Sequence, residues 1–446
     1  MNSSPRKPQV LKGFRDYLPR SMLLRQRIMT TFREIFERHG FEPIDTPALE
    51  YLGILTGKAG ENEKLMYHFV DQGGREIGLR YDLTVPLARV VAMHQNDLVL
   101  PFKRYHIAPV WRAEKPQRGR YREFWQCDAD IVGSATMLAD AEIVGIMAEA
   151  LAAVGLGNAV IHINHRQLLE AMARVAGFDE SRSGTLFRTI DKLGKVGAEA
   201  VTRELTDNGI SSEAAERILA LVSLQGTPSE LISDVSERLR EDDSAISALA
   251  ELGELFGYLE AMDLPPARFA FDLALARGLD YYTGPVYEAV VEEPKIGSVA
   301  GAGRYDGLIG TFLGRSIPAT GMSLGVERIV EVVEEFGLLS TPRSVADVFV
   351  AVFPDTIAAA MEIARELRET GINVDIGLQP KRGVGDQLKY ADRRGIPIAI
   401  IAGSAEIARG SVAIKELKTG EQRDFLITEL ATGVSEMLAQ VESSAS

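Results

Sequence analysis

Residues 110–133, VWRAEKPQRGRYREFWQCDADIVG, decide how this chain is interpreted. Around a single acid, Glu114, they gather five cations: Arg112, Lys115, Arg118, Arg120 and Arg122. The stretch then becomes apolar and acidic. Strand-forming residues flank a turn at 115–119, which predicts a β-hairpin. Such a hairpin would hold several guanidinium groups over one site, and these groups bind phosphate oxygens two at a time. A solvated charged loop is the alternative, against which Phe124, Trp125 and Gln126 argue.

The composition is that of an ordinary folded protein. The chain has 446 residues, of which 46% are hydrophobic and 25% are charged, and at about 100–200 residues per domain this length predicts two to four domains. No apolar run of about 18 residues is present and the N-terminus shows no apolar signal segment, so we expect no membrane span and a cytoplasmic location. One cysteine, Cys127, excludes a disulfide framework and a cysteine-rich zinc site.

The charge is distributed unevenly. The net charge of −14 argues against indiscriminate binding of nucleic acids. Residues 103–122 nevertheless contain seven Lys or Arg residues and one acid. A focused positive site on a negative body suits one specific polyanion, such as ATP or the end of a tRNA.

The opening stretch resembles motif 2 of the class II aminoacyl-tRNA synthetases, in the wording of the histidyl enzymes, and the match runs from Arg112 to Phe124. Four further stretches are similar to the same family: RYDLTVP at 80–86, RGLDYY at 277–282, AGRYDGL at 302–308, and GMSLGVER at 321–328, which resembles motif 3. The resemblance extends from Lys12 to about Leu438. A dinucleotide-binding loop is excluded at 301–306, because the third glycine of that fingerprint is missing.

The amino-terminal part predicts a helix, a short strand and a hairpin. Apolar residues recur at helical spacing over 22–39, Gly40 suits the helix end, and a proline-interrupted edge strand follows at 41–47. This pair resembles motif 1, which implies a homodimer interface, although the pattern alone is that of a core helix. Residues 67–70 and 77–80 alternate around DQGG, which predicts a hairpin.

The chain divides into three predicted parts. The resemblance implies an α+β catalytic domain on an antiparallel sheet of the class II type, formed by residues 1–166 and 263–337. Residues 167–262 are rich in helix formers and resemble a helical insertion that approaches the tRNA acceptor arm. Strands alternate with helices over 345–440, which predicts a small α/β domain with a mostly parallel sheet. This part resembles an anticodon-binding domain, although its basic residues suit ordinary solvated positions equally well.

The resemblance implies a histidine–tRNA ligase reaction in two steps. The carboxylate of histidine attacks the α-phosphorus of ATP, and the adenylate then acylates the 3′ end of tRNA(His). A carboxylate is ionised at neutral pH and requires no protein nucleophile. The reaction requires in-line positioning and cations beside the phosphate.

The same resemblance assigns the site residues. Arg112 and Arg277 are the expected catalytic residues, on either side of the α-phosphate. The expected histidine-binding residues are Asp82, Thr84 and Gln126 around the α-ammonium, Asp130, Tyr281 and Tyr282 around the imidazole, and Tyr305 in the pocket wall. Arg112 is expected at the substrate carboxylate, and Leu83 and Arg277 complete the expected substrate-binding set. The expected ATP-binding residues are Arg112, Glu114, Arg120 and Arg328. Asp130 stands where many bacterial members carry Glu. The residues around it resemble the sequence pattern of eukaryotic-type members.

No prosthetic group or protein metal site is expected, and Mg²⁺ enters with ATP. His162 and His165 have a spacing that occurs in metal sites, but no third ligand lies nearby in sequence, so a structural role is favoured. The alternative function is a catalytically inactive regulatory subunit of the same fold that senses histidine. Such proteins lose parts of the 277–282 stretch and the C-terminal domain, both of which are intact here. Another class II synthetase would lack the sequence pattern found here at residues 277–282.

Overall fold

The computed structural model describes residues 7–56, 64–175, 177, 183–190, 193–276, 281–291, 293 and 297–443. The chain separates into two compact units. The first comprises Met1–Asp16 and Ile28–Leu339, and the second comprises Tyr17–Arg27 and Ser340–Ser446.

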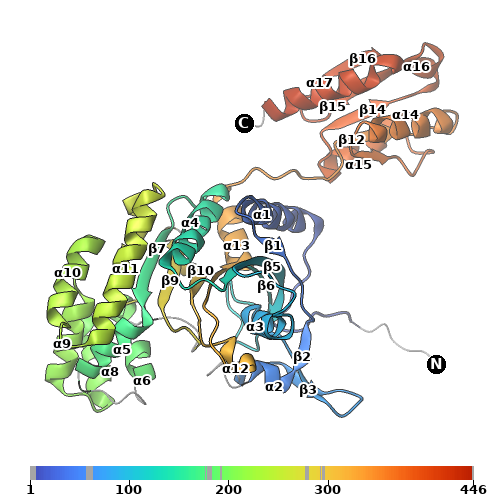
Figure 1. Cartoon of the computed structure of the whole chain (residues 1–446). Helices are drawn as coiled ribbons and strands as arrows, with labels where there is room; N and C mark the ends of the chain where they lie inside the picture. The colour runs from blue at the N-terminus through green and yellow to red at the C-terminus, as the bar shows by residue number, and fades with distance from the viewer. Residues whose placement is uncertain are drawn as a thin grey trace. The chain divides into compact units, whose positions relative to one another are not determined.

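A sheet of eight described strands forms the centre of the first unit (Figure 1). Its order is β1-β5-β6-β11-β10-β9-β7-β8, and all neighbours are antiparallel except β1 with β5 and β7 with β8. The strands are β1 (Glu42–Pro43), β5 (Phe102–Trp111), β6 (Glu123–Val132), β7 (Val160–His165), β8 (Phe269–Phe271), β9 (Pro285–Val291), β10 (Gly297–Arg304) and β11 (Ala319–Gly325).

The longest strands, β5 and β6, form the predicted hairpin. Their register places Arg104 opposite Asp130 and His106 opposite Asp128. Gln117 and Arg120 exchange backbone hydrogen bonds of 3.1 and 2.9 Å across the turn. Gly119 adopts a φ of 67° there, which glycine accommodates without steric conflict. The hairpin prediction is therefore confirmed.

Helix α4 (Met137–Ala153) covers the face of the sheet opposite the pocket described below, and it contacts β6, β9, β10 and β11. The helix is apolar on nearly every side because α11 packs against it as well. Its one fully buried carboxylate, Asp140, accepts hydrogen bonds from the Tyr287 hydroxyl at 2.8 Å and from Arg304 Nε at 3.1 Å. These bonds tie α4 to β9 and β10.

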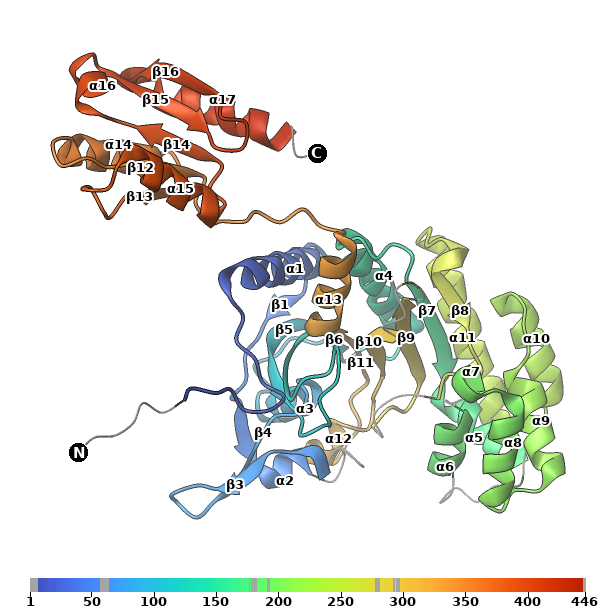
Figure 2. The same cartoon turned by 180° about the vertical axis from the view of Figure 1, so that it is seen from behind.

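Further helices and a second sheet surround this core (Figures 1 and 2). The helices are α1 (Pro19–Arg38), α2 (Leu52–Leu55), α3 (Thr84–Met93), α12 (Gly310–Leu313) and α13 (Val326–Phe336). A second sheet has the order β2-β4-β3, with β2 (Leu49–Tyr51), β3 (His68–Val70) and β4 (Glu76–Leu79). The predicted helix at 22–39 and the predicted hairpin at 67–80 are thus confirmed. Strand β1 is shorter than the predicted 41–47, which agrees with the missing N–H donor of Pro43.

A helical segment lies between β7 and β8 in sequence. Both views place it beside β7 at that end of the main sheet, and α5 and α11 contact β7 (Figures 1 and 2). Its helices are α5 (Arg166–Val175), α6 (Ser183–Ile190), α7 (Leu193–Val196), α8 (Ala198–Asp207), α9 (Ser212–Val222), α10 (Pro228–Arg238) and α11 (Asp243–Ala261). Thr227 and Glu230 form a capping box that fixes the start of α10.

The second unit contains a five-stranded sheet of order β13-β12-β14-β15-β16. Its elements are β12 (Val348–Ala351), α14 (Ile357–Glu369), β13 (Val374–Ile376), α15 (Val384–Arg394), β14 (Ile398–Ile401), α16 (Ser404–Ala408), β15 (Ser411–Glu416), β16 (Gln422–Leu426) and α17 (Leu430–Ser443). The prediction of a mostly parallel sheet was wrong, because β15 pairs antiparallel with β14 and with β16, so only two of the four strand pairs are parallel. The turn around Gly420 joins these two strands directly, so no crossover helix separates them.

Within the described ranges, no helix combines the length and the apolar character that a membrane crossing requires.

We predict that Asp140→Ala destabilises the first unit by about 3–5 kcal/mol, because it removes the one buried carboxylate that pairs with the Arg304 guanidinium and leaves it only the partly exposed Asp306. Urea unfolding followed by circular dichroism measures the effect. Asp97→Ala, which removes a carboxylate that is 78% exposed, is the control and is expected to change stability by less than about 0.5 kcal/mol. Equal midpoints for the two variants would contradict the prediction.

Candidate active site

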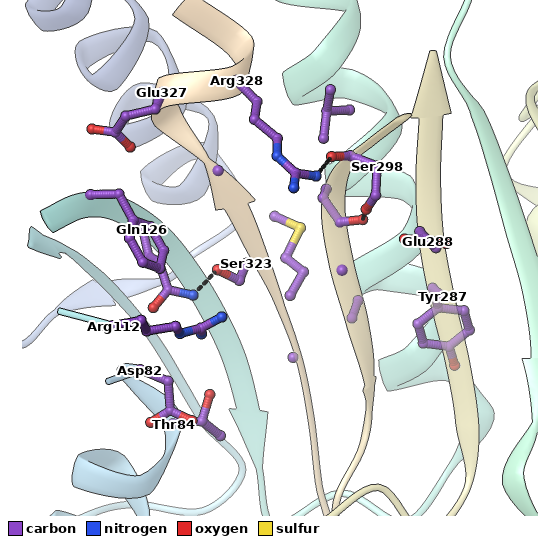
Figure 3. Close-up of a pocket in the computed structure, with 18 of the residues that line it drawn as sticks. Asp82, Thr84, Arg112, Gln126, Tyr287, Glu288, Ser298, Ser323, Glu327 and Arg328 are labelled. Atoms are coloured by element: carbon purple, nitrogen blue, oxygen red, sulfur yellow. Dashed lines mark hydrogen bonds between the residues drawn. The ribbon is translucent and has the colours of Figure 1, made fainter. Parts of the chain in front are cut away.

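A pocket of about 360 Å³ opens on the face of the main sheet that α4 does not cover (Figure 3). Eleven of the thirteen predicted site residues line it: Asp82, Thr84, Arg112, Glu114, Arg120, Gln126, Asp130, Tyr281, Tyr282, Tyr305 and Arg328. They come from segments that are more than 240 positions apart in the sequence. The fold therefore brings side chains from separate sequence motifs into one pocket.

Two predicted site residues are not part of this lining. The Leu83 side chain is buried and packs with Ala108, Val110 and Phe124, while its carbonyl oxygen accepts a hydrogen bond from Arg104 Nη2 at 3.3 Å. Arg277 lies outside the described residues. The roles of both residues remain predictions.

Glycines keep the floor of the pocket low. A Cβ atom on Gly321 would lie 1.9 Å from Asp130 Oδ1, and one on Gly303 would lie 2.7 Å from the Tyr282 ring. Around Gly301 no atom would lie within 4 Å of such a Cβ. Gly321 and Gly303 thus leave room for the Asp130 and Tyr282 side chains, and Gly301 leaves open space at the pocket.

One end of the pocket combines a buried carboxylate with three tyrosines. Asp130 forms an ion pair of 2.6 Å with Arg104 and accepts a hydrogen bond from the Tyr305 hydroxyl. The Tyr281 ring centroid lies 5.8 Å from that of Tyr305 and 5.0 Å from that of Tyr282. Burial raises the pKa of Asp130, and the Arg104 charge opposes this shift. A flat ring that carries N–H donors fits between the aromatic faces and the carboxylate.

Next to it lie two oxygen atoms suited to a cation. Asp82 Oδ1 accepts a hydrogen bond from the Val85 amide at 3.1 Å, while Oδ2 has no hydrogen-bond partner among the described residues. Gln126 Nε2 donates to Ser323 Oγ at 2.6 Å (Figure 3), and Gln126 Oε1 likewise lacks a described partner. Burial raises the pKa of Asp82 to about 6, so it is mostly ionised at neutral pH. An ammonium group would satisfy both free oxygens.

Two anchored cations also line the pocket, Arg112 beside Asp82 and Arg328 farther away, near Ser298 (Figure 3). Arg112 Nε donates to the Tyr81 carbonyl at 2.9 Å, and its guanidinium lies 5.1 Å from the Phe124 ring centroid. These contacts fix the plane of the guanidinium, which projects into the pocket (Figure 3). Arg328 donates to the carbonyl oxygens of Ser298 and, at 3.4 Å, of Gly119. Two anchored guanidinium groups suit an anionic ligand such as a phosphate chain.

Other arginines of the hairpin turn away from this site. Arg118 pairs with Glu335 of α13, and Arg122 donates to the carbonyl oxygens of Glu114 and Lys12. The expectation that the hairpin holds its guanidinium groups over one spot was therefore wrong for these two. They attach the hairpin turn to neighbouring segments, whereas Arg120 stays half-exposed at the pocket, 3.9 Å from Glu114.

Sequence reasoning missed Arg104, Asp128 and Ser323. The alternation of Gln126, Asp128 and Asp130 along β6 could have identified Asp128, since every second residue of a strand faces the same side. Arg104 requires the register of the hairpin, and Ser323 requires the pairing of β11 with β6. Burial raises the pKa of Asp128 to about 8, opposed by the charge of Arg104.

The geometry defines the class of protein. A mostly antiparallel sheet that carries an arginine-bearing hairpin and an arginine at the start of a following helix is the catalytic fold of a class II aminoacyl-tRNA synthetase. Residues 13–329 match the family model of histidyl-tRNA synthetase, and residues 347–437 match that of the anticodon binding domain. The chain belongs to the histidyl-tRNA synthetase family.

Individual relatives agree over nearly the whole length. The chain is 43% identical over 421 residues to a histidine–tRNA ligase of Rhodopirellula baltica, covering 94% of this chain and 95% of that protein. It is also 43% identical over 438 residues to a histidine–tRNA ligase of Aeropyrum pernix, covering 97% of this chain and 99% of that protein. The crystal structure of histidyl-tRNA synthetase from Nostoc sp. PCC 7120 superimposes with a TM-score of 0.87 at 33% identity, covering 97% of this chain and 100% of that one. The predicted fold class is confirmed.

We predict that Asp128→Asn changes the pH dependence of stability. The folded chain holds a proton on Asp128 up to a pKa of about 8, whereas the ordinary pKa is 3.8. The unfolded chain therefore binds fewer protons between these values, and the wild type loses stability relative to Asp128→Asn as the pH rises from 4 to 8. The slope is at most about 1.4 kcal/mol per pH unit. Urea midpoints of both proteins at pH 5, 6, 7 and 8 test this, and a constant difference would contradict it.

We predict that Gly321→Ala destabilises the first unit, because the added methyl group would displace the Asp130 carboxylate. Overpacking of this kind destabilises by about 1–3 kcal/mol. Gly301→Ala is the matched control for stability, since its methyl group meets open space. Thermal unfolding of the two variants should show the lower midpoint for Gly321→Ala, and a reversed order would refute the steric explanation.

Proposed function

We propose that this chain attaches L-histidine to tRNA(His) in an ATP-dependent reaction that passes through a histidyl-adenylate. The observation that carries the proposal is the arrangement of one pocket. A buried carboxylate with tyrosines, two free oxygen acceptors and two anchored arginines line the same cavity, with Arg112 beside Asp82 and Arg328 farther away (Figure 3). The names of relatives that are 43% identical over nearly the full chain support the same activity.

Histidine is proposed to bind with its α-ammonium against Asp82, Thr84 and Gln126. The two free oxygens of Asp82 and Gln126 support this orientation. The imidazole would lie against Asp130, Tyr281, Tyr282 and Tyr305, where the buried carboxylate accepts an N–H of the ring. The substrate carboxylate would then point toward Arg112.

Adenylate formation is proposed to depend on positioning and charge. The ionised carboxylate of histidine attacks the α-phosphorus of ATP, and pyrophosphate leaves. Arg112 would stabilise the charge that develops on the α-phosphate, since its Nε is already held by Tyr81 and only its outer nitrogens are free to turn toward the ligand. Arg277 is proposed for the opposite side of the phosphate, on the sequence resemblance alone. Arg120 and Arg328 would bind the outer phosphates, with Glu114 near the adenine.

Mg²⁺ is proposed to arrive bound to the phosphates of ATP. In the part of the chain that the structure describes, no cluster of three His, Cys, Asp or Glu side chains is arranged to hold a metal ion. The ion would neutralise phosphate charge there.

The remaining assignments extend the proposal to the other parts of the chain. Residues 1–166 and 263–337 would form the catalytic domain, 167–262 the insertion that approaches the tRNA acceptor arm, and 345–440 the anticodon-binding domain. The match of 347–437 to an anticodon binding domain supports the last. A homodimer and a cytoplasmic location are proposed as well, the latter supported by a rice relative designated cytoplasmic, at 38% identity over 98% of this chain.

The alternative of a histidine-sensing regulatory subunit is not favoured. A solved structure from Bacillus halodurans, described as an ATP phosphoribosyltransferase regulatory subunit or histidyl-tRNA synthetase, has a TM-score of 0.76 at 25% identity. The pocket nevertheless retains Arg112, Arg120 and Arg328, which a protein that only senses histidine does not require.

We predict histidine-dependent exchange of pyrophosphate into ATP, with Arg112→Ala about 100- to 1,000-fold slower because one donor to the developing charge is lost. Arg118→Ala is the matched control from the same hairpin, because its guanidinium pairs with Glu335 outside the pocket. Its rate should remain within about fivefold of wild type, as expected for an exposed ion pair. The Arg277→Ala variant tests the proposed second arginine in the same assay.

Exchange supported by histidine alone among the twenty amino acids would establish the substrate. A folded protein that binds histidine but exchanges no pyrophosphate would point to the regulatory subunit. Equal loss in the Arg112 and Arg118 variants would contradict the proposed division of the hairpin.

A further inference from the structure

The end of strand β7 supports a segment that forms part of the pocket wall. In the main sheet β7 lies between β8, with which it pairs in parallel, and β9, with which it pairs antiparallel (Figure 1). The described part of the connection from β8 to β9 contributes Leu275, Tyr281 and Tyr282 to the pocket lining. Contacts that attach this connection to β7 therefore set the position of that wall.

Asn164 of β7 holds the first flank of the connection. Its side chain is fully buried, at 0% exposure. Its Nδ2 donates to the carbonyl oxygens of Leu275 at 3.0 Å and of Leu273 at 3.3 Å, and its Oδ1 accepts from the His165 amide at 2.8 Å. Carbonyl oxygens only accept, so these three contacts allow the amide a single orientation. Without the Asn164 amide, polar backbone atoms of buried residues would lose their partners, which proteins rarely tolerate.

Asp272 closes the turn that presents Leu275. The Asp272 amide donates to the Ile163 carbonyl oxygen at 2.9 Å, which extends the pairing of β7 with β8 by one residue. The Asp272 Oδ1 accepts from the Ala274 amide at 2.9 Å, and the Asp272 carbonyl oxygen accepts from the Leu275 amide at 3.0 Å. The turn is thus held both by β7 and by its own hydrogen bonds.

The residues after Asn164 hold the second flank. The Arg166 amide donates to the carbonyl oxygen of Gly284 at 2.9 Å, and Gly284 follows Tyr282 by two positions. Both flanks of the wall segment are therefore attached to four consecutive residues, 163–166. A single short junction, at which β7 passes into α5, supports the wall from both sides.

His165 makes this junction rigid. Its ring is buried, and its Nδ1 accepts from the Gln167 amide at 3.2 Å, so the neutral ring carries its proton on Nε2. Nε2 donates to Glu251 Oε2 of α11 at 3.0 Å. A shift of the junction would break contacts to β8, β9 and α11 together. A support of this kind can hold a binding surface in a fixed position.

We propose that Asn164 is a positioning residue for the binding of histidine. Through the carbonyl oxygens of Leu273 and Leu275 it fixes the pocket wall to which Tyr281 and Tyr282 belong. The inference rests on the proposed function, because it assigns this wall to the amino-acid substrate. Asn164 does not line the pocket, so it acts on the substrate only through the backbone that it holds.

The first test removes the amide. In Asn164→Ala, the KM for histidine in pyrophosphate exchange should rise at least about tenfold, because three hydrogen bonds that support the wall are lost. The KM for ATP should stay within about threefold, since Arg112 and Arg328 are anchored by other contacts. Calorimetric titration with histidine, without ATP, should show the same weakening of binding.

Gln387→Ala is the matched control. The Gln387 side chain is 4% exposed and makes the same set of contacts in the second unit. Its Nε2 donates to the carbonyl oxygens of Val352 and Arg382 at 2.8 and 3.0 Å, and its Oε1 accepts from the Val352 amide at 3.0 Å. None of these residues lines the pocket. The control loses an equally bonded buried amide, and its KM for histidine should stay within about twofold of wild type.

A second pair of variants tests the same wall if Asn164→Ala does not fold. The Asp272 side chain is 31% exposed, so its loss is better tolerated. Asp272→Ala removes the acceptor of the Ala274 amide and should raise the KM for histidine about 3- to 10-fold. Asp272→Asn keeps an acceptor oxygen at that position and should stay within about twofold. A role in folding alone would change stability without changing the KM of the folded protein.

Three outcomes overturn the proposal. They are a KM for histidine within twofold of wild type in folded Asn164→Ala, an equal rise of that KM in Gln387→Ala, and equal KM values in the two Asp272 variants. Failure of the proposed function gives a different result, because the wild type would then show no exchange with histidine. The calorimetric comparison of wild type with Asn164→Ala would still test the positioning role.

Discussion

The pocket depends on one buried ion pair, between Arg104 and Asp130. Both side chains are almost completely removed from solvent, at 0% and 2% exposure, where a charge is tolerated only beside its partner. Arg104 also donates to the Leu83 carbonyl, which ties the segment carrying Asp82 to the sheet. Asp130 accepts from Tyr305, which ties the AGRYDGL stretch at 302–308 to the same point. One interaction thus fixes three separate parts of the chain around the ligand.

The hairpin β5–β6 carries both chemical ends of the site. Arg112 lies beside its turn, and Gln126 and Asp130 lie along β6, so the spacing between phosphate and amino-acid recognition is set by strand geometry. A site on rigid strands holds its groups more closely than one on loops. For a reaction that requires positioning rather than a protein nucleophile, this rigidity is the main contribution of the fold. Gly321 contributes to this site because its missing side chain leaves space for the Asp130 carboxylate.

Much of this arrangement could be predicted from the sequence, because strand alternation and turn residues are local signals. The hairpin around Gly119 and the helix at 22–39 followed from such patterns, whereas the catalytic motifs followed from the resemblance to a known family. The Arg104–Asp130 pair, the turning away of Arg118 and the Ser323 contact could not be predicted, since each depends on strand register or on tertiary packing. Strand β16 was missed for a related reason: its residues are mostly exposed and polar, so the strand lacks the apolar alternation that marks a half-buried strand.

The most direct measurement of the central claim is a crystal structure of the chain with a non-hydrolysable analogue of histidyl-adenylate. We expect the imidazole beside Asp130 and Tyr305, the α-ammonium within hydrogen-bonding distance of Asp82 and of Gln126 Oε1, and the phosphate beside Arg112. An analogue bound with its imidazole beside Arg328, or with its ammonium group facing the Gln126 amide nitrogen, would contradict this binding mode.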